Sequence, residues 1–86
     1  MHVLVVYDIP GDRTRARVAD ACLDYGLDRI QYSAFYGRLS RPHQESLMVE
    51  ISQVVGDDPA NVQLIPICER DWRTRLSLEQ GDDGEG

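Results

Sequence analysis

Residues 3–12 read VLVVYDIPGD, and this stretch decides the fold. Its first five residues are continuously apolar and mostly β-branched, which is typical of a strand buried on both faces in the centre of a sheet. Asp8 ends the apolar run, and Pro10-Gly11 favours a type II turn. Asp12 is a good helix N-cap, so a helix should begin directly after the turn. The stretch therefore predicts a strand–turn–helix unit.

The segment that follows has helical periodicity from Arg13 onward. Its apolar residues form a stripe of Ala16, Ala19 and Leu23, flanked by Val18, Cys22 and Tyr25. Gly26 is placed to supply the left-handed residue that ends a helix. Residues 29–37 are aromatic and partly alternating, so they predict two short strands that meet at a bend near Ser33.

A second helix is expected to open at Ser40 or at Arg41-Pro42, because proline is favoured in a first helical turn. Gly56 closes this helix. Its apolar positions have helical spacing: Leu47, Ile51, Val54 and Val55. Residues 62–67 predict a strand, which Pro66 places at the edge of the sheet or near its own end. Residues 72–78 alternate apolar and polar side chains and predict one more strand. The order β-α-β-β-α-β, with this additional C-terminal strand, predicts an α+β, ferredoxin-like domain over residues 1–78.

Composition indicates a small globular protein. The chain has 86 residues with a net charge of −6, and all nine basic residues are arginine. Residues 79–86 hold four of the fifteen acids and no base, so we expect a disordered acidic tail. No apolar run is long enough to cross a bilayer and no secretory signal is present, which favours a cytoplasmic protein without membrane contact. A core this modest favours oligomerisation. Cys22 and Cys68 lack metal-ligand spacing and are expected to be small buried residues.

Asp8 is the first candidate functional residue, because the end of a buried strand holds its carboxylate rigidly. It could simply cap the following turn through an Asx-type hydrogen bond. As a ligand of Mg²⁺ it would need further oxygen donors, and no acid two or four residues away shares its face. A twofold axis beside this strand end would bring in Asp8 of a second copy, and the pair could hold one metal that activates water.

Arginines and aromatic residues offer a second set of candidates. Arginine binds phosphate bidentately, and Arg13 and Arg17 share a helix face. The alternative is a solvated helix face on which these arginines pair with Asp20 and Asp24. Core packing is the more ordinary use of aromatic residues in strands. Three of them on the middle strands could instead stack bases: Tyr32, Phe35 and Tyr36.

Four stretches carry a resemblance to a known family: VVYDI at 5–9, RARVA at 15–19, YGLDRIQYSAF at 25–35 and VQLIPIC at 62–68. Together they cover nearly the whole chain except the tail, and residues 26–35 are specific. The sequence resembles the CRISPR-associated Cas2 family of spacer-acquisition proteins. The resemblance implies a ferredoxin-like homodimer in which Asp8 of each copy flanks the twofold axis and binds Mg²⁺.

The resemblance also implies an activity, which is metal-dependent endonuclease cleavage of single-stranded RNA or double-stranded DNA, and a partner, the Cas1 integrase dimer. The family's aspartate and neighbouring tyrosine fall on Asp8 and Tyr7, the candidate catalytic residues. Its nucleic-acid-binding residues fall on Arg15, Arg17, Arg29 and Phe35.

Two functions remain open on the residues themselves. One is a metal-dependent phosphodiesterase with Asp8 as ligand. The other is a non-catalytic DNA-binding scaffold of the spacer-integration complex, which would use the same arginines and need no metal. A generic ferredoxin-like RNA-binding or regulatory module is a third, weaker interpretation.

Overall fold

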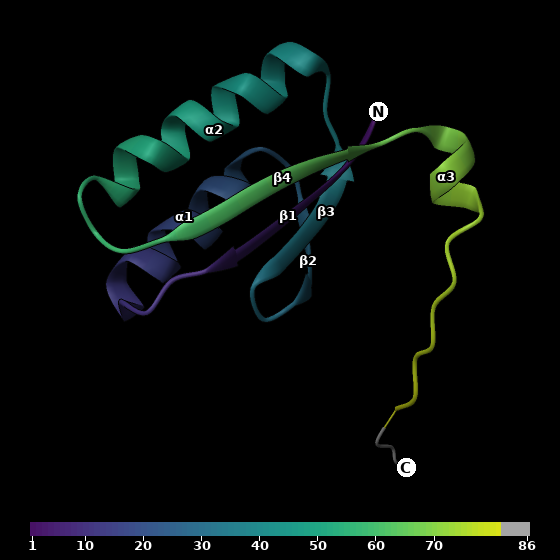
Figure 1. Cartoon of the computed structure of the whole chain (residues 1–86), viewed down its shortest axis with the longest axis horizontal. Coiled ribbons are helices and arrows are strands. Elements are labelled where there is room, and N and C mark those ends of the chain that lie inside the picture. The colour runs from purple at the N-terminus through teal and green to yellow at the C-terminus, as the bar shows by residue number, and fades with distance from the viewer. Residues whose placement is uncertain (82–86) are drawn as a thin grey trace.

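An antiparallel four-stranded sheet with the strand order β2-β3-β1-β4 carries two helices on one of its faces (Figure 1). The computed structural model describes residues 1–81. Its elements are β1 (His2–Asp8), α1 (Asp12–Asp24), β2 (Asp28–Gln31), β3 (Ala34–Arg38), α2 (Arg41–Val55), β4 (Asn61–Ile67) and α3 (Glu69–Arg73). The predicted ferredoxin-like βαββαβ order is confirmed, and β4 is an edge strand as Pro66 indicated.

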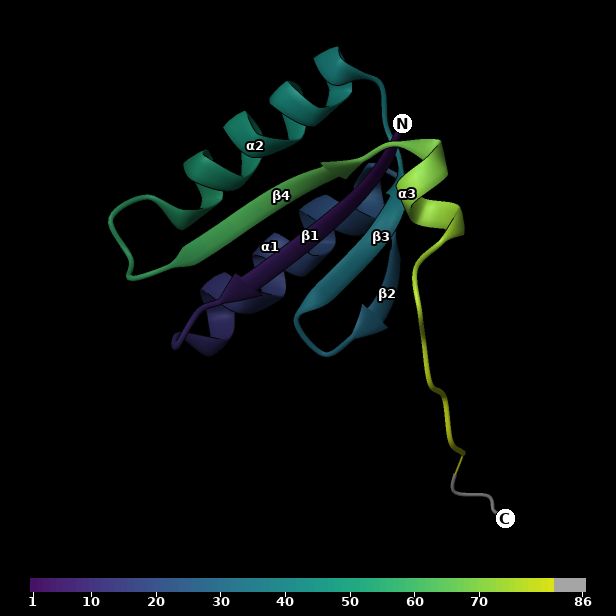
Figure 2. The same ribbon diagram turned by 45° about the vertical axis from the view of Figure 1, so that its right-hand side comes forward.

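Strand β1 occupies the centre of the sheet between β3 and β4. Val3 and Val5 are fully buried on the side covered by α1 and α2, whereas Leu4 and Val6 on the other side are only half-buried. The prediction of a central strand is therefore confirmed, but burial on both faces is wrong for a single chain. Both long helices pack on the same side of the sheet, so neither covers the other side (Figure 2). We call that other side the open face.

Helix α1 differs from its prediction at its start and in its rotation. Gly11 is the N-cap residue, and Asp12 is the first residue of the helix rather than its cap. Ala16 and Leu23 of the predicted stripe are exposed. The buried residues are Thr14, Val18, Ala19, Ala21 and Cys22. The helix is therefore rotated so that Val18 and Cys22, which flank the predicted stripe, face the core in place of Leu23.

The remaining predicted boundaries agree with the structure. Gly26 has a φ of 81° and ends α1, and the β2–β3 turn lies at Tyr32-Ser33. Ser40 caps α2 by accepting a hydrogen bond from the backbone N–H of His43, and Pro42 lies in the first turn. Phe35, Leu47 and Ile51 belong to the core. Cys22 is buried as expected, but Cys68 is exposed, so its predicted burial is wrong.

The predicted C-terminal strand is also wrong for the described chain, because residues 69–73 form the short helix α3 and residues 74–81 have no regular structure. Trp72 lies against the open face, where its ring stacks on Tyr36 with 4.2 Å between centroids. Leu76 and Leu78 are 97% and 82% exposed. Alternation makes a strand only where a neighbouring strand offers hydrogen bonds, and none reaches this segment within the described part of one chain.

The predicted acidic tail begins in this irregular segment, and its residues 82–86 lie outside the described residues. None of the helices in the described part is long and apolar enough to span a bilayer.

Candidate functional site

Asp8 lies exposed at the carboxyl end of β1. Because side chains alternate along a strand and Tyr7 faces the core, Asp8 belongs to the open face. The β1–β4 register places Asn61 directly opposite Asp8 and Gln63 opposite Val6, and these residues line one shallow hollow. Gln63 Nε2 donates a hydrogen bond to Asn61 Oδ1 over 3.5 Å. A carboxylate and an amide oxygen thus share one end of the open face, a donor set that suits Mg²⁺.

One chain supplies only part of a metal site here. Residues 1–81 contain no group of three or more His, Cys, Asp or Glu side chains placed to hold a metal ion. Asp8 is the single carboxylate of the hollow. Further oxygen ligands would have to come from Asn61, from water, from a nucleic-acid phosphate or from a second copy of the chain.

Tyr7 points away from Asp8, to the other side of the sheet. Its side chain is 6% exposed, and its ring stacks on Phe35 with 6.3 Å between centroids. Its hydroxyl has no hydrogen-bond partner among the described residues. Burial raises the pKa of Tyr7, and the nearby Arg29 guanidinium opposes that rise without cancelling it. The two predicted catalytic residues are neighbours in sequence, but their side chains are not brought together.

Arg29 and Phe35, both predicted nucleic-acid contacts, lie opposite each other on β2 and β3. The Arg29 guanidinium lies over the Phe35 ring, 5.1 Å from its centroid. Arg29 is exposed, whereas Phe35 is fully buried. Phe35 therefore supports the position of Arg29, and only Arg29 of this pair offers a surface to a ligand.

Arg15 projects from the first turn of α1 and is held by its neighbours. Its Nη1 donates a 2.8 Å hydrogen bond to the carbonyl oxygen of Ile9, and its Nη2 forms an ion pair with Asp12. The Asp12 carboxylate, followed by the Tyr32 hydroxyl, raises the pKa of Arg15. Arg15 and Arg29 both lie near the ring of Tyr32, and together with Asp12 and Ala16 these residues line a second hollow. We call Arg15, Arg29 and Tyr32 the arginine–tyrosine cluster.

Arg17 is exposed on α1 and forms neither a salt bridge nor a side-chain hydrogen bond within residues 1–81. The ion pairs of the described chain do not include Asp20 or Asp24, so the alternative in which Arg13 and Arg17 pair with those acids is wrong. The guanidinium of Arg17 is consequently available to a phosphate.

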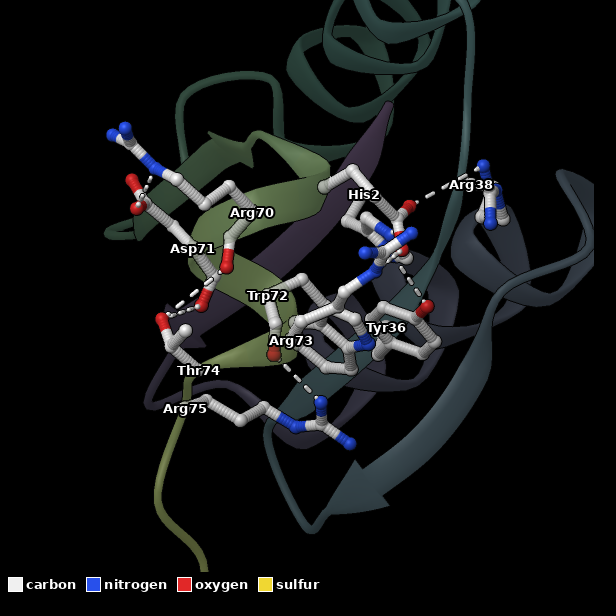
Figure 3. Close-up of polar contacts among 10 residues, drawn as sticks. His2, Tyr36, Arg38, Arg70, Asp71, Trp72, Arg73, Thr74 and Arg75 are labelled. Atoms are coloured by element: carbon white, nitrogen blue, oxygen red, sulfur yellow. Dashed lines mark hydrogen bonds and ion pairs between the residues drawn. The ribbon is translucent and has the colours of Figure 1, made fainter.

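The opposite end of the open face is closed by contacts between α3 and the sheet (Figure 3). His2 Nε2 donates a 2.7 Å hydrogen bond to Glu69, and its Nδ1 lies 2.6 Å from the Tyr36 hydroxyl. A carboxylate only accepts, so Nε2 carries a proton, and in a neutral ring Nδ1 accepts from Tyr36. Trp72 stacks between Tyr36 and the Arg75 guanidinium, which lies 3.7 Å from its ring centroid. These contacts fix α3 on the sheet.

Asn61 was missed as a site residue. The placement of Asn61 depends on the β1–β4 register, which no local pattern reveals. Tyr32 was one of three candidates for base stacking, with core packing as the more ordinary use; the structure places it exposed in the β2–β3 turn, so core packing is wrong for Tyr32.

Comparison with known proteins adds independent evidence. A family model described as CRISPR associated protein Cas2 matches residues 1–75. The chain is 60% identical over 80 residues to "CRISPR-associated endoribonuclease Cas2 2" of Chloroflexus aurantiacus, which covers 93% of this chain and 94% of that protein. It is 37% identical over 78 residues to a Cas1/Cas2 endonuclease fusion of Thermoproteus tenax, with coverages of 91% and 30%. The crystal structure of Streptococcus pyogenes Cas2 has the same fold, with a TM-score of 0.77 and 24% identity over 92% of this chain and 100% of that one.

Proposed function

Because the chain belongs to the CRISPR associated protein Cas2 family, we propose that it acts in spacer acquisition as a Mg²⁺-dependent endonuclease that works with the Cas1 integrase. The similar Chloroflexus protein is named an endoribonuclease, and the Thermoproteus relative is a fusion of Cas1 with Cas2. The observation that carries the proposal is the exposed carboxylate of Asp8, which a central strand holds beside the amide of Asn61.

The active form in this proposal is a homodimer joined through the open face. Leu4 and Val6 are only half-buried there, and Ile65 of β4 is exposed. Within residues 1–81 the outer edge of β4 has no neighbouring strand, while Leu76 and Leu78 project from an irregular segment that could pair with it in a second copy. Such a dimer would cover apolar surface that a small domain otherwise exposes.

In this dimer the two Asp8 carboxylates would face each other across the axis. Two carboxylates that face each other at close range repel unless a cation or a shared proton lies between them. Mg²⁺ held there would polarise a phosphoryl oxygen and lower the pKa of a bound water. Asp8 and Asn61 would orient the ion, and Arg15, Arg17 and Arg29 would hold the phosphates of the nucleic-acid backbone.

The second candidate function is a non-catalytic scaffold for the DNA that is being integrated. One observation favours it: the described chain supplies a single carboxylate at the hollow, with no histidine or lysine beside it that could act as a general acid or base. Arg15 and Arg29 line a different hollow from Asp8, so a scaffold would retain these phosphate contacts without any metal.

A cleavage assay separates the two functions. Single-stranded RNA and duplex DNA are incubated with wild type or Asp8→Ala, in Mg²⁺ and in excess chelator, with Asp20→Ala as an exposed-acid control on α1. The nuclease predicts Mg²⁺-dependent cleavage that only Asp8→Ala removes. A scaffold predicts duplex binding without cleavage by any of the three proteins. Cleavage that persists at full rate in Asp8→Ala contradicts the assignment of Asp8.

A further inference from the structure

Tyr32 is the only exposed phenylalanine, tyrosine or tryptophan among residues 1–81. It lies in the β2–β3 turn with 70% of its surface exposed, whereas Phe35 three residues later is fully buried. The turn is fixed to the central strand, because the backbone N–H of Tyr7 donates a 3.1 Å hydrogen bond to the carbonyl oxygen of Ser33. A largely exposed ring on a fixed turn can bind a ligand without a large loss of entropy.

Two guanidinium groups accompany this ring, one from α1 and one from β2. Arg15 lies 5.6 Å and Arg29 lies 5.9 Å from the centroid of Tyr32. Each arginine is held by a second contact, Arg15 by the carbonyl oxygen of Ile9 and Arg29 by the ring of Phe35. The three side chains line one hollow, where two positive charges outweigh the single acid, Asp12.

The ligand that matches this arrangement is a nucleotide with an unpaired base. Guanidinium groups bind phosphate oxygens, and an exposed ring stacks on the flat face of any base. In a continuous duplex each base face already stacks on its neighbours, so the ring can reach a base only at a single strand, a frayed end or a flipped position.

We propose that Tyr32 stacks on an unpaired nucleobase whose flanking phosphates are bound by Arg15 and Arg29. This rests on the proposed nucleic-acid function and deepens it, because it assigns the arginine–tyrosine cluster a preference for unpaired over fully paired strands. Tyr32 is a binding residue in this assignment and has no part in bond cleavage.

The test measures affinity by fluorescence anisotropy in excess chelator, so that no substrate is cleaved. Tyr32→Leu removes the aromatic face but keeps an apolar side chain, Tyr32→Phe keeps the face, and Leu23→Ala is a control at an exposed apolar residue of α1. The probes are a single-stranded oligonucleotide, the same strand with abasic sites, and a blunt duplex. The salt dependence of binding is measured for each.

We expect Tyr32→Leu to weaken single-strand binding about tenfold. Tyr32→Phe and Leu23→Ala should bind like wild type. Binding of the abasic strand and of the duplex should be the same in all four proteins. The salt slope should not change in Tyr32→Leu, because the phosphate contacts remain.

Equal binding of the intact single strand by wild type and Tyr32→Leu overturns the stacking role. An equal loss on the intact strand, the abasic strand and the duplex also overturns it, because Tyr32 would then act only by positioning the arginines. If wild type binds duplex but no single strand, this inference fails while the proposed function survives. If it binds no nucleic acid at all, both fail.

Discussion

The side chains of Tyr7 and Asp8 lie on opposite faces of the central strand. Tyr7 is buried against Phe35 on the helix-covered side, while Asp8 is exposed on the open face opposite Asn61. Adjacent residues of a strand necessarily diverge in this way. The adjacent Tyr7 and Asp8 are therefore two separate features: a core residue on the helix-covered side and a carboxylate on the open face.

Tyr7→Phe tests this separation. The Tyr7 hydroxyl is buried without a hydrogen-bond partner in the described chain, so its removal should leave the free energy of unfolding unchanged or raise it by about 1 kcal/mol. Mg²⁺-dependent cleavage should be retained. Denaturant unfolding and initial cleavage rates check both statements. A rate loss of about 100-fold in a normally folded Tyr7→Phe protein would place the hydroxyl in the chemistry.

Arg17 is the cleanest probe of phosphate binding. Its guanidinium forms no ion pair within residues 1–81, so Arg17→Ala should not alter the melting temperature. It should lower the slope of log affinity against log salt by about one unit, equally for all sequences. Arg41→Ala on α2 is the control for the salt slope alone, because Arg41 forms an ion pair with Glu45. An unchanged slope in Arg17→Ala would show that Arg17 is a solvated surface residue that does not bind phosphate.

Arg15→Ala should behave differently from Arg17→Ala, because Arg15 also holds the β1–α1 turn through the carbonyl oxygen of Ile9. We expect the same change of salt slope together with a lower melting temperature. Thermal unfolding and salt titration of the two variants, measured side by side, check the distinction. Equal melting temperatures for the two variants would show that the Arg15 contact does not stabilise the fold.

Attachment of α3 should depend on pH through Glu69. The hydrogen bond from His2 lowers the pKa of Glu69 below its ordinary value of 4.5, with smaller help from Arg73 and Arg38. The stability that this contact adds is therefore present above pH 4.5 and is lost as pH falls through the lower, folded-state pKa. Trp72 fluorescence followed from pH 7 to pH 3 should show this acid step in wild type. Glu69→Gln should lack it, and an identical step in both proteins would contradict the assignment.

The exposed leucines after α3 test the dimer. Leu76→Asp combined with Leu78→Asp should shift the protein from dimer to monomer, because charges replace apolar groups where strand pairing with a second copy is proposed. Sedimentation velocity at micromolar concentration measures the change, with Leu23→Asp on α1 as the control. A wild-type chain that is already a folded monomer under these conditions would contradict the homodimer.

Local patterns predicted most of the fold. The apolar run of residues 3–7, Gly26 and Gly56 each carry a signal that depends only on near neighbours, and the structure confirms the element that each one indicates. The rotation of α1 was mispredicted because the choice between Leu23 and Val18 depends on how the helix packs on the sheet. The alternation of residues 72–78 predicted a strand, but strand formation requires a neighbouring strand, and the described part of one chain does not provide one.

The candidate site was predictable only where it is local. The position of Asp8 at a strand end follows from the sequence alone. Its pairing with Asn61 depends on the β1–β4 register, and the approach of Arg15 to Tyr32 depends on the packing of α1 beside β2. Both contacts join residues far apart in the chain, and no periodicity or motif encodes them.

The central claim is that Asp8 residues of two copies bind one divalent cation. Mn²⁺ is a suitable probe because it shares the oxygen ligands of Mg²⁺ and its free ion is counted directly by electron paramagnetic resonance. Titration of Mn²⁺ into wild type, Asp8→Asn and the control Asp20→Asn should give one bound ion for every two chains in wild type and Asp20→Asn, and none in Asp8→Asn. Equal Mn²⁺ binding by Asp8→Asn and wild type would contradict the account.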